Sequence, residues 1–156
     1  MRYRTQGFTL IELLVALAVS AILLTLVVPA FSQMAQRSKA DSDISELLRS
    51  LNYARLEAID RGLPIHLRPA AVDSDWSRGL SIYQGDGPAT NVLRVVPAVS
   101  RGARLTLTSE FDSIGFNALG GVSAAVPPVM TYVLGGQHRT ITLCLNGRIA
   151  VNGECQ

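Results

Sequence analysis

The carboxylate of Glu12 lies near the start of an apolar run, Leu13 to Phe31, that contains no charged side chain. A helix of this length matches the ~30 Å hydrocarbon core of a bilayer. A carboxylate at such depth costs several kcal/mol unless it reaches the headgroups, takes up a proton or pairs with a cation. Glu12 therefore either extends to the headgroup region one helical turn away or has a functional partner.

The two cysteines, Cys144 and Cys155, are close together near the C-terminus. Their spacing matches neither a C-x-x-C redox pair nor part of a four-ligand metal site. We therefore predict that they form a disulfide in an oxidising compartment.

The remaining residue types do not indicate catalysis. The sequence has two histidines and lacks the motifs of serine hydrolases, zinc proteases and nucleotide-binding enzymes. His66 alternates with apolar residues, as on one face of a strand, and G-D-G-P around Asp86 lacks the carboxylate spacing of a calcium loop. We expect no enzyme, no cofactor and no metal.

Basic side chains suggest a nucleic-acid interface, although the whole chain carries a net charge of only +2. Solvated arginines at a sheet edge are the preferred interpretation, and any DNA binding should be weak and independent of sequence. The candidate DNA contacts lie in the C-terminal half: Arg101, Arg104, His138, Arg139 and Arg148.

A long helix must position Glu12. Apolar residues continue beyond the first run at helical spacing, at Ile44, Leu47, Leu48, Leu51, Ala54, Ala58 and Ile59. Gly62 and Pro64 are a strong stop signal, because glycine suits the left-handed C-cap and proline cannot continue a helix. We predict a helix over residues 8–61, with residues 8–31 in a membrane and the second half packed on another layer.

Residues 62–156 have the pattern of a β domain, with short β-rich runs separated by Gly, Pro, Asn and Asp. The apolar stripe of the helix would complete its core. The predicted fold is therefore α+β, a long N-terminal helix packed on a C-terminal antiparallel β domain that forms a small sandwich or twisted sheet. The predicted strands are 65–68, 79–83, 92–96, 103–108, 113–116, 130–134 and 139–145.

The segment G-F-T-L-I-E-L-L-V-A-L-A-V-S-A-I-L resembles the class III leader and N-terminal helix of type IV pilins and type II secretion pseudopilins. The resemblance implies that residues 1–7 are a leader and that a prepilin peptidase cuts between Gly7 and Phe8 and methylates Phe8. Glu12 would pair with the amine of Phe8 on a neighbouring subunit, and Pro29 would let the helix bend during filament assembly. The basic residues before the apolar run predict a cytoplasmic N-terminus in the bacterial inner membrane and a periplasmic C-terminal domain.

Several later segments, from E-L-L-R-S-L-N-Y-A-R to I-T-L-C, resemble minor pilins and pseudopilins of the FimT/FimU and GspH group. This resemblance implies a minor pilin at or near the tip of a type IV pilus, with other minor and major pilins, the assembly platform and membrane lipid as partners. The alternatives are a type II secretion pseudopilin and a DNA receptor for natural transformation. FimT-type DNA binders carry a G-R-x-R motif, but here Gly147 and Arg148 are followed by Ala150 in place of the second arginine.

Overall fold

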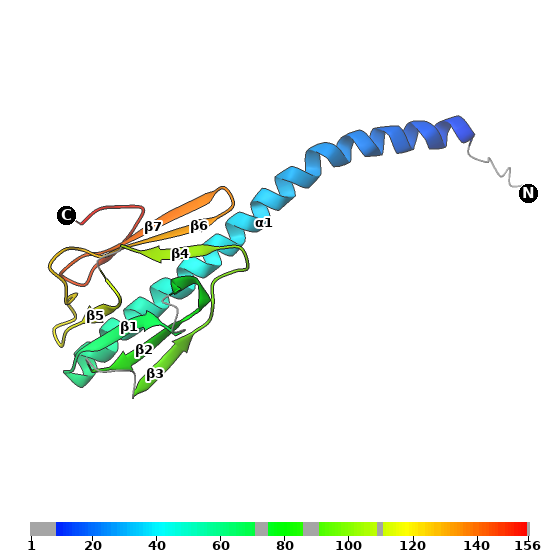
Figure 1. Ribbon diagram of the computed structural model, residues 1–156. Helices are drawn as coiled ribbons and strands as arrows, with labels where there is room; N and C mark the ends of the chain where they lie inside the picture. The colour runs from blue at the N-terminus through cyan, green and yellow to red at the C-terminus, as the bar shows by residue number, and fades with distance from the viewer. Residues whose placement is uncertain (1–8, 71–74, 86–90, 109–110, 156) are drawn as a thin grey trace, which may run out of the picture. The chain divides into compact units, whose positions relative to one another are not determined.

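The computed structural model describes residues 9–70, 75–85, 91–108 and 111–155. The chain divides into two compact units, residues 1–35 and residues 36–156. One continuous helix, α1 (Leu10–Arg61), contributes to both units, and all strands belong to the second (Figure 1). The predicted α+β class, a long helix packed on antiparallel sheets, is confirmed.

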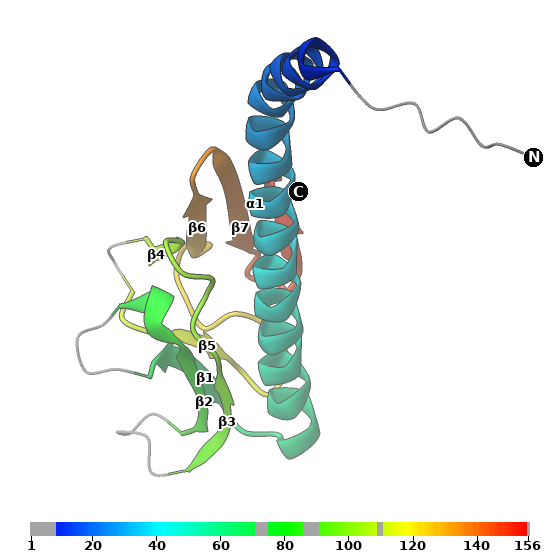
Figure 2. The same ribbon diagram turned by 90° about the vertical axis from the view of Figure 1, so that its right-hand side faces the viewer.

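The second unit contains two four-stranded antiparallel sheets. The strand order is β3-β2-β1-β5 in the first sheet and β4-β6-β7-β8 in the second. Figure 2 shows both sheets on one side of the helix. The strands are β1 (Ile65–Pro69), β2 (Leu80–Gln84), β3 (Val92–Val96), β4 (Arg104–Leu107), β5 (Ile114–Phe116), β6 (Val129–Leu134), β7 (Gln137–Leu143) and β8 (Ile149–Val151).

The helix contributes an apolar stripe to the core of the second unit. Its buried residues recur every three or four positions, as one helical face requires: Ala40, Ile44, Leu47, Leu51, Ala54 and Ala58. The stripe meets apolar side chains from both sheets, including Leu67, Ile82, Tyr132 and Ile141. Because neither sheet buries its inner face alone, the helix is part of the core.

Two details of the predicted stripe were wrong. Ile59 is 46% exposed, because the helical repeat places Ala58 rather than Ile59 on the buried face. The stripe also begins one turn earlier than predicted, at Ala40, which is fully buried. An alanine between polar residues gives little hydrophobic signal, so periodicity alone missed it.

The end of the helix follows its stop signal. The last helical residue is Arg61, and Gly62 has a φ of 62°, the left-handed conformation of a C-cap glycine. Each of the seven predicted strands overlaps a strand of the structure, and β8 was not predicted. Its three residues, I-A-V, are too few for alternation to be recognised, and β8 exists through its pairing with β7.

A group of hydrogen bonds joins Asp43 on the helix to β6 and to the loop that precedes β4. Asp43 accepts hydrogen bonds from the backbone N–H of Ser100 (2.9 Å), the Ser100 hydroxyl (3.0 Å) and the Tyr132 hydroxyl (2.6 Å). Tyr132 is fully buried on β6, and Ser100 precedes β4. Burial, together with the bond to the Asp43 carboxylate, raises the pKa of Tyr132 well above its usual range. The proton therefore stays on the hydroxyl, and the contact fixes the helix against the β4-β6-β7-β8 sheet.

Candidate assembly site

The helix begins with a reciprocal cap between Thr9 and Glu12. The Glu12 carboxylate accepts hydrogen bonds from the backbone N–H and the hydroxyl of Thr9, both at 2.9 Å. In return, the Glu12 N–H donates to the Thr9 hydroxyl oxygen at 3.3 Å. This is a capping box, which satisfies N–H groups that have no partner within the helix.

This capping role of Glu12 was not predicted from the sequence. The signal was present, because T-L-I-E places a threonine three residues before a glutamate at the start of an apolar helix. The cap gives the carboxylate a partner within its own chain. The predicted cleavage residues, Gly7 and Phe8, lie outside the described residues.

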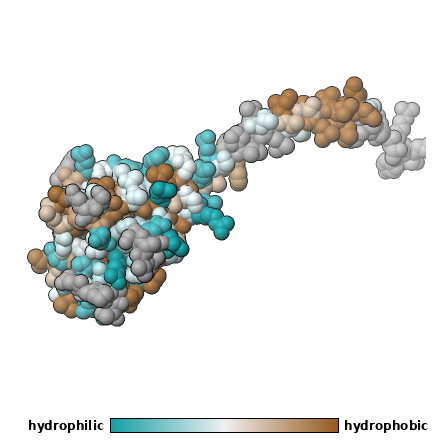
Figure 3. All heavy atoms as spheres, in the orientation of Figure 1, coloured by the Kyte–Doolittle hydropathy of each residue, from teal (hydrophilic) through white to brown (hydrophobic). Residues whose placement is uncertain are grey.

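The N-terminal part of α1 is covered with apolar side chains, which Figure 3 shows in brown. Residues on every side of the helix are exposed, including Leu10, Leu13, Leu17 and Ile22. Among the described residues we find no helix with the length and apolar character needed to cross a membrane. An apolar helix surface of this kind is stable only when lipid or other protein covers it.

Polar groups within this apolar segment are satisfied by the helix itself. The Ser20 hydroxyl donates to the carbonyl of Ala16 at 2.8 Å, and the Thr25 hydroxyl donates to that of Ile22 at 2.7 Å. Such bonds remove the need for water at these hydroxyls. The chain remains helical through Pro29, the residue at which the sequence predicts a bend.

The predicted disulfide is present. Cys144, which follows β7, is bonded to Cys155, with the two Cα atoms 5.4 Å apart. The bridge closes a loop that contains β8 and secures the C-terminal tail against β7. The Thr142 hydroxyl adds a hydrogen bond to the Gly153 carbonyl at 3.0 Å, so the tail is held by both covalent and polar contacts.

The candidate DNA contacts do not form one patch. Gly147, next to Arg148, lies against the Gly120 carbonyl and the end of the Arg55 side chain, because a Cβ there would lie 1.9 Å from the Gly120 oxygen and 2.7 Å from the Arg55 Nε. The turn of the β6–β7 hairpin, at Gly135, lies against Gln36 at the other end of the unit. About 28 Å of helix separates residues 36 and 55, so Arg148 and the hairpin that carries His138 and Arg139 lie at opposite ends.

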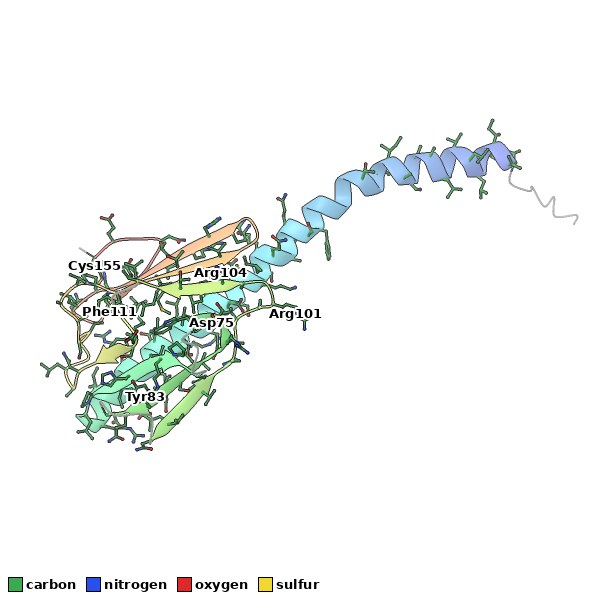
Figure 4. The ribbon with its side chains drawn as sticks, viewed as in Figure 1. Asp75, Tyr83, Arg101, Arg104, Phe111 and Cys155 are labelled. Atoms are coloured by element: carbon green, nitrogen blue, oxygen red, sulfur yellow. A yellow bond between two sulfur atoms is a disulfide. The ribbon has the colours of Figure 1, made fainter. Side chains whose placement is uncertain are left out.

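Several of these cations are also engaged within the chain. Arg139 forms an ion pair with Asp41 at 3.2 Å, and Arg148 donates to the Glu154 carbonyl at 3.2 Å. Arg104 lies near Asp75 (Figure 4). Hydrogen bonds from Ser77 are the main cause that lowers the pKa of Asp75, and the positive charges of Arg78 and Arg104 lower it further. Only Arg101 of the four arginines has no hydrogen bond, ion pair or charge contact with the described residues.

Aromatic and histidine side chains have structural surroundings. His66 on β1 stacks on Tyr83 of β2 with ring centroids 5.6 Å apart, and the Arg68 guanidinium lies 4.7 Å from the centre of the same ring. Trp76 is buried in a short 3₁₀ helix (Trp76–Arg78). These contacts support the prediction that His66 is a strand-face residue.

A groove with a volume of about 220 Å³ lies beside the helix. Asp43, Glu46, Trp76, Val96 and Leu105 are among the residues that line it. Its acidic side chains already have partners, because Asp43 binds Ser100 and Tyr132, and Glu46 binds Arg49 (2.8 Å) and Arg94 (3.2 Å). No three metal-ligating side chains come together in the part of the chain that the structure describes.

Comparison with known families gives two matches. The family described as type II transport protein GspH matches residues 43–148, and the prokaryotic N-terminal methylation motif matches residues 2–28. The chain belongs to the GspH family. This family consists of structural pilins and pseudopilins that assemble with other pilins, so the chain is a structural subunit and not an enzyme.

Solved structures of minor pilins have the same fold. Two crystal structures of the type IV minor pilin FimU from Pseudomonas aeruginosa match this chain. The first has 24% identity and a TM-score of 0.67, and the second has 25% identity and a TM-score of 0.61. They cover 75% and 72% of this chain and 90% and 92% of FimU. The minor pseudopilin EpsH of the Vibrio cholerae type 2 secretion system matches at 20% identity, 72% and 94% coverage and a TM-score of 0.49. Curated proteins give no match.

Proposed function

We propose that this GspH-family subunit is a minor pilin, located at or near the tip of a type IV pilus, where it supports pilus assembly. The observation that carries the proposal is the likeness to the type IV minor pilin FimU, which has 25% identity over 72% of this chain. The N-terminal methylation motif supports the accompanying processing step. In this proposal, prepilin peptidase removes residues 1–7 and methylates Phe8.

The exposed apolar surface of α1 supports membrane anchoring followed by filament assembly. Lipid covers residues 8–31 before assembly, in a single pass with the C-terminal domain in the periplasm, and the helices of other pilins cover them afterwards. The inner-membrane assembly platform carries out the transfer. Either environment buries the same side chains, which explains why one helix serves both states.

Glu12 gives the assembly step its register. In the free subunit the Thr9 cap satisfies the carboxylate, as the 2.9 Å contacts show. In the filament the carboxylate pairs with the positively charged amine of Phe8 on the neighbouring subunit, a stronger interaction in an apolar environment. A subunit seated out of register leaves that amine unpaired, which is costly.

The alternative is a type II secretion pseudopilin, since the family name refers to type II transport. Deletion of the gene in the organism that encodes it separates the two functions. We expect loss of surface pili and twitching motility, with normal secretion of type II substrates and recovery on complementation. Normal piliation together with lost secretion would establish the pseudopilin and contradict the proposal.

A further inference from the structure

The two sheets of the second unit have the edge strands β3 and β5, and β4 and β8. In the part of the chain that the structure describes, all of these edges except β3 are protected. The β4 edge is bonded to Ser77, whose hydroxyl accepts from the Leu105 N–H at 2.9 Å and donates to the Leu105 carbonyl at 3.4 Å. The β5 edge is bridged to a later segment through Phe116 and Val122. β8 has only three residues, and such short edge strands are poor templates for pairing.

The remaining edge strand, β3, is open. It has five residues, and Figure 1 shows it as the outermost strand of its sheet. Among the described residues, no hydrogen bond from outside the sheet reaches the backbone of Val92–Val96. In an antiparallel strand every second residue directs its N–H and C=O away from the paired neighbour. Beyond a bulge at Leu93, β3 pairs regularly with β2 and leaves its outward backbone groups available.

The side chains of β3 differ between the two faces of the sheet. Val92 and Val95 are 45% and 63% exposed. Arg94 faces α1, where it bonds to Glu46 at 3.2 Å and lies 5.4 Å from the centre of the Tyr53 ring. Edge strands that avoid pairing usually carry lysine, proline or a covering segment, whereas exposed valines favour the addition of another strand.

The helix side of this edge has an excess of positive charge. The Glu46 carboxylate is shared by two arginines, because one oxygen accepts from Arg49 at 2.8 Å and the other accepts from Arg94 at 3.2 Å. The acid that follows on the same side of α1, Glu57, is paired with Arg61. A strand beside β3 would place a side chain next to Arg94 on the same face, so an acidic residue there would balance the charge.

We propose that the β3 edge binds an extended segment of a partner protein, which adds to the first sheet as a further strand. The segment has β-branched residues beside Val92 and Val95, alternating with acidic residues beside Arg94. A second copy of this chain fits less well, because antiparallel pairing of two β3 strands about Arg94 sets like charges opposite each other. The proposed edge is independent of the pilus function, since a pseudopilin would have the same open strand.

Titration with a synthetic strand tests this proposal in the full-length chain, held in detergent micelles. The probe is a capped peptide of about seven residues that alternates valine and glutamate, which is long enough for one strand. Amide hydrogen exchange, measured by NMR, locates the pairing. We expect exchange to slow within Val92–Val96 and to stay unchanged at the edges of β4 and β8.

Modified peptides and matched variants separate strand pairing from other contacts. Methylation of every peptide amide nitrogen removes the donors and should weaken binding at least about tenfold. Replacing the glutamates with lysine should weaken it about fivefold, because like charges then meet at Arg94. Val95→Asn should also weaken it about fivefold. The matched control, Val126→Asn, changes a valine that is 47% exposed outside the sheets and should bind as the wild type does.

Three results would overturn the proposal. Equal binding of the methylated peptide would show that side chains, and not backbone pairing, hold it. Slower exchange at another edge, or no binding at millimolar peptide, would reject β3 as the binding site. Dimerisation of the chain that Val95→Asn abolishes, measured by sedimentation, would make a second copy the occupant in place of a partner protein.

Discussion

At the residue scale, Glu12 has one observed role, the helix cap, and one proposed role, the pairing between subunits, and these roles have different partners. The cap with Thr9 is local and forms in a single subunit. The proposed pairing with the Phe8 amine requires a second subunit. Substitutions that affect the two partners differently can separate these roles.

We predict that Glu12→Val leaves cleavage and membrane insertion intact, because an apolar side chain only favours the bilayer. The variant should be depleted from sheared pili, since the neighbouring amine loses its partner. Immunoblots of pilus and membrane fractions measure both outcomes. Ser20→Ala, which removes a hydroxyl bonded only to its own helix, is the control and should enter pili normally. Wild-type amounts of Glu12→Val in pili would contradict the register role.

The disulfide is the second feature at this scale. The Cys144–Cys155 bridge joins residues 11 positions apart, and a loop of this size should stabilise the folded domain by about 2 to 3 kcal/mol. We expect the double substitution Cys144→Ser and Cys155→Ser to lower the melting temperature by roughly 10 °C. Reductant should lower the melting temperature of the wild type alone. An unchanged melting temperature in the double variant would show that the bridge adds no stability.

At the element scale, the contact of Tyr132 with Asp43 is a buried polar link between α1 and the β4-β6-β7-β8 sheet. Tyr132→Phe removes one of the three donors to the Asp43 carboxylate. We expect the free energy of unfolding to fall by about 1 to 2 kcal/mol. Tyr83→Phe is a suitable control, because Tyr83 stacks on Arg68 in the other sheet. Denaturant unfolding of residues 36–156 measures both variants.

The same contact predicts a dependence of stability on alkaline pH. The folded state raises the pKa of Tyr132, so it retains a proton that the unfolded chain loses above pH ~10. The stabilisation should therefore be complete below pH ~10 and decline as the pH rises towards the folded-state pKa. Above pH ~10, unfolding free energies should fall more steeply for the wild type than for Tyr132→Phe. Parallel curves would show that Tyr132 does not cause the decline.

At the scale of the whole molecule, the distribution of arginines sets the expected affinity for DNA. Arg148 and the hairpin with Arg139 lie at opposite ends of the second unit. A short stretch of duplex that contacts one of them therefore makes few phosphate contacts with the other. We expect residues 36–156 to bind duplex DNA weakly and without sequence preference, with a Kd of ~10⁻⁴ to 10⁻⁶ M. Mobility shifts at several salt concentrations measure the affinity and its salt dependence.

Substitutions near the C-terminus refine this expectation. Ala150→Arg should tighten binding and steepen the salt dependence by about one unit, because it adds roughly one phosphate contact. Arg148→Ala should have the opposite effect, and Arg61→Ala, at the end of α1, is the charge control. Submicromolar binding at physiological salt that Arg148→Ala abolishes would make DNA uptake the primary function.

The sequence by itself determined the features that depend on local order. A long helix was predicted from the apolar run that follows Glu12 and from the stop signal at Gly62. A β domain was predicted from the alternation in residues 65–145. Such patterns are visible because the period of a helix or strand is set by the backbone. The two cysteines were paired correctly because no other cysteine competes.

Only the tertiary structure decided which distant residues meet. Asp43 and Tyr132 are 89 positions apart, and neither has a sequence signal for the other. The five candidate DNA contacts appeared as one group in the sequence, yet the packing of Gly147 on Arg55 and of Gly135 on Gln36 separates them. Contacts between elements depend on how the strands pair and how the helix crosses them, which local periodicity does not contain.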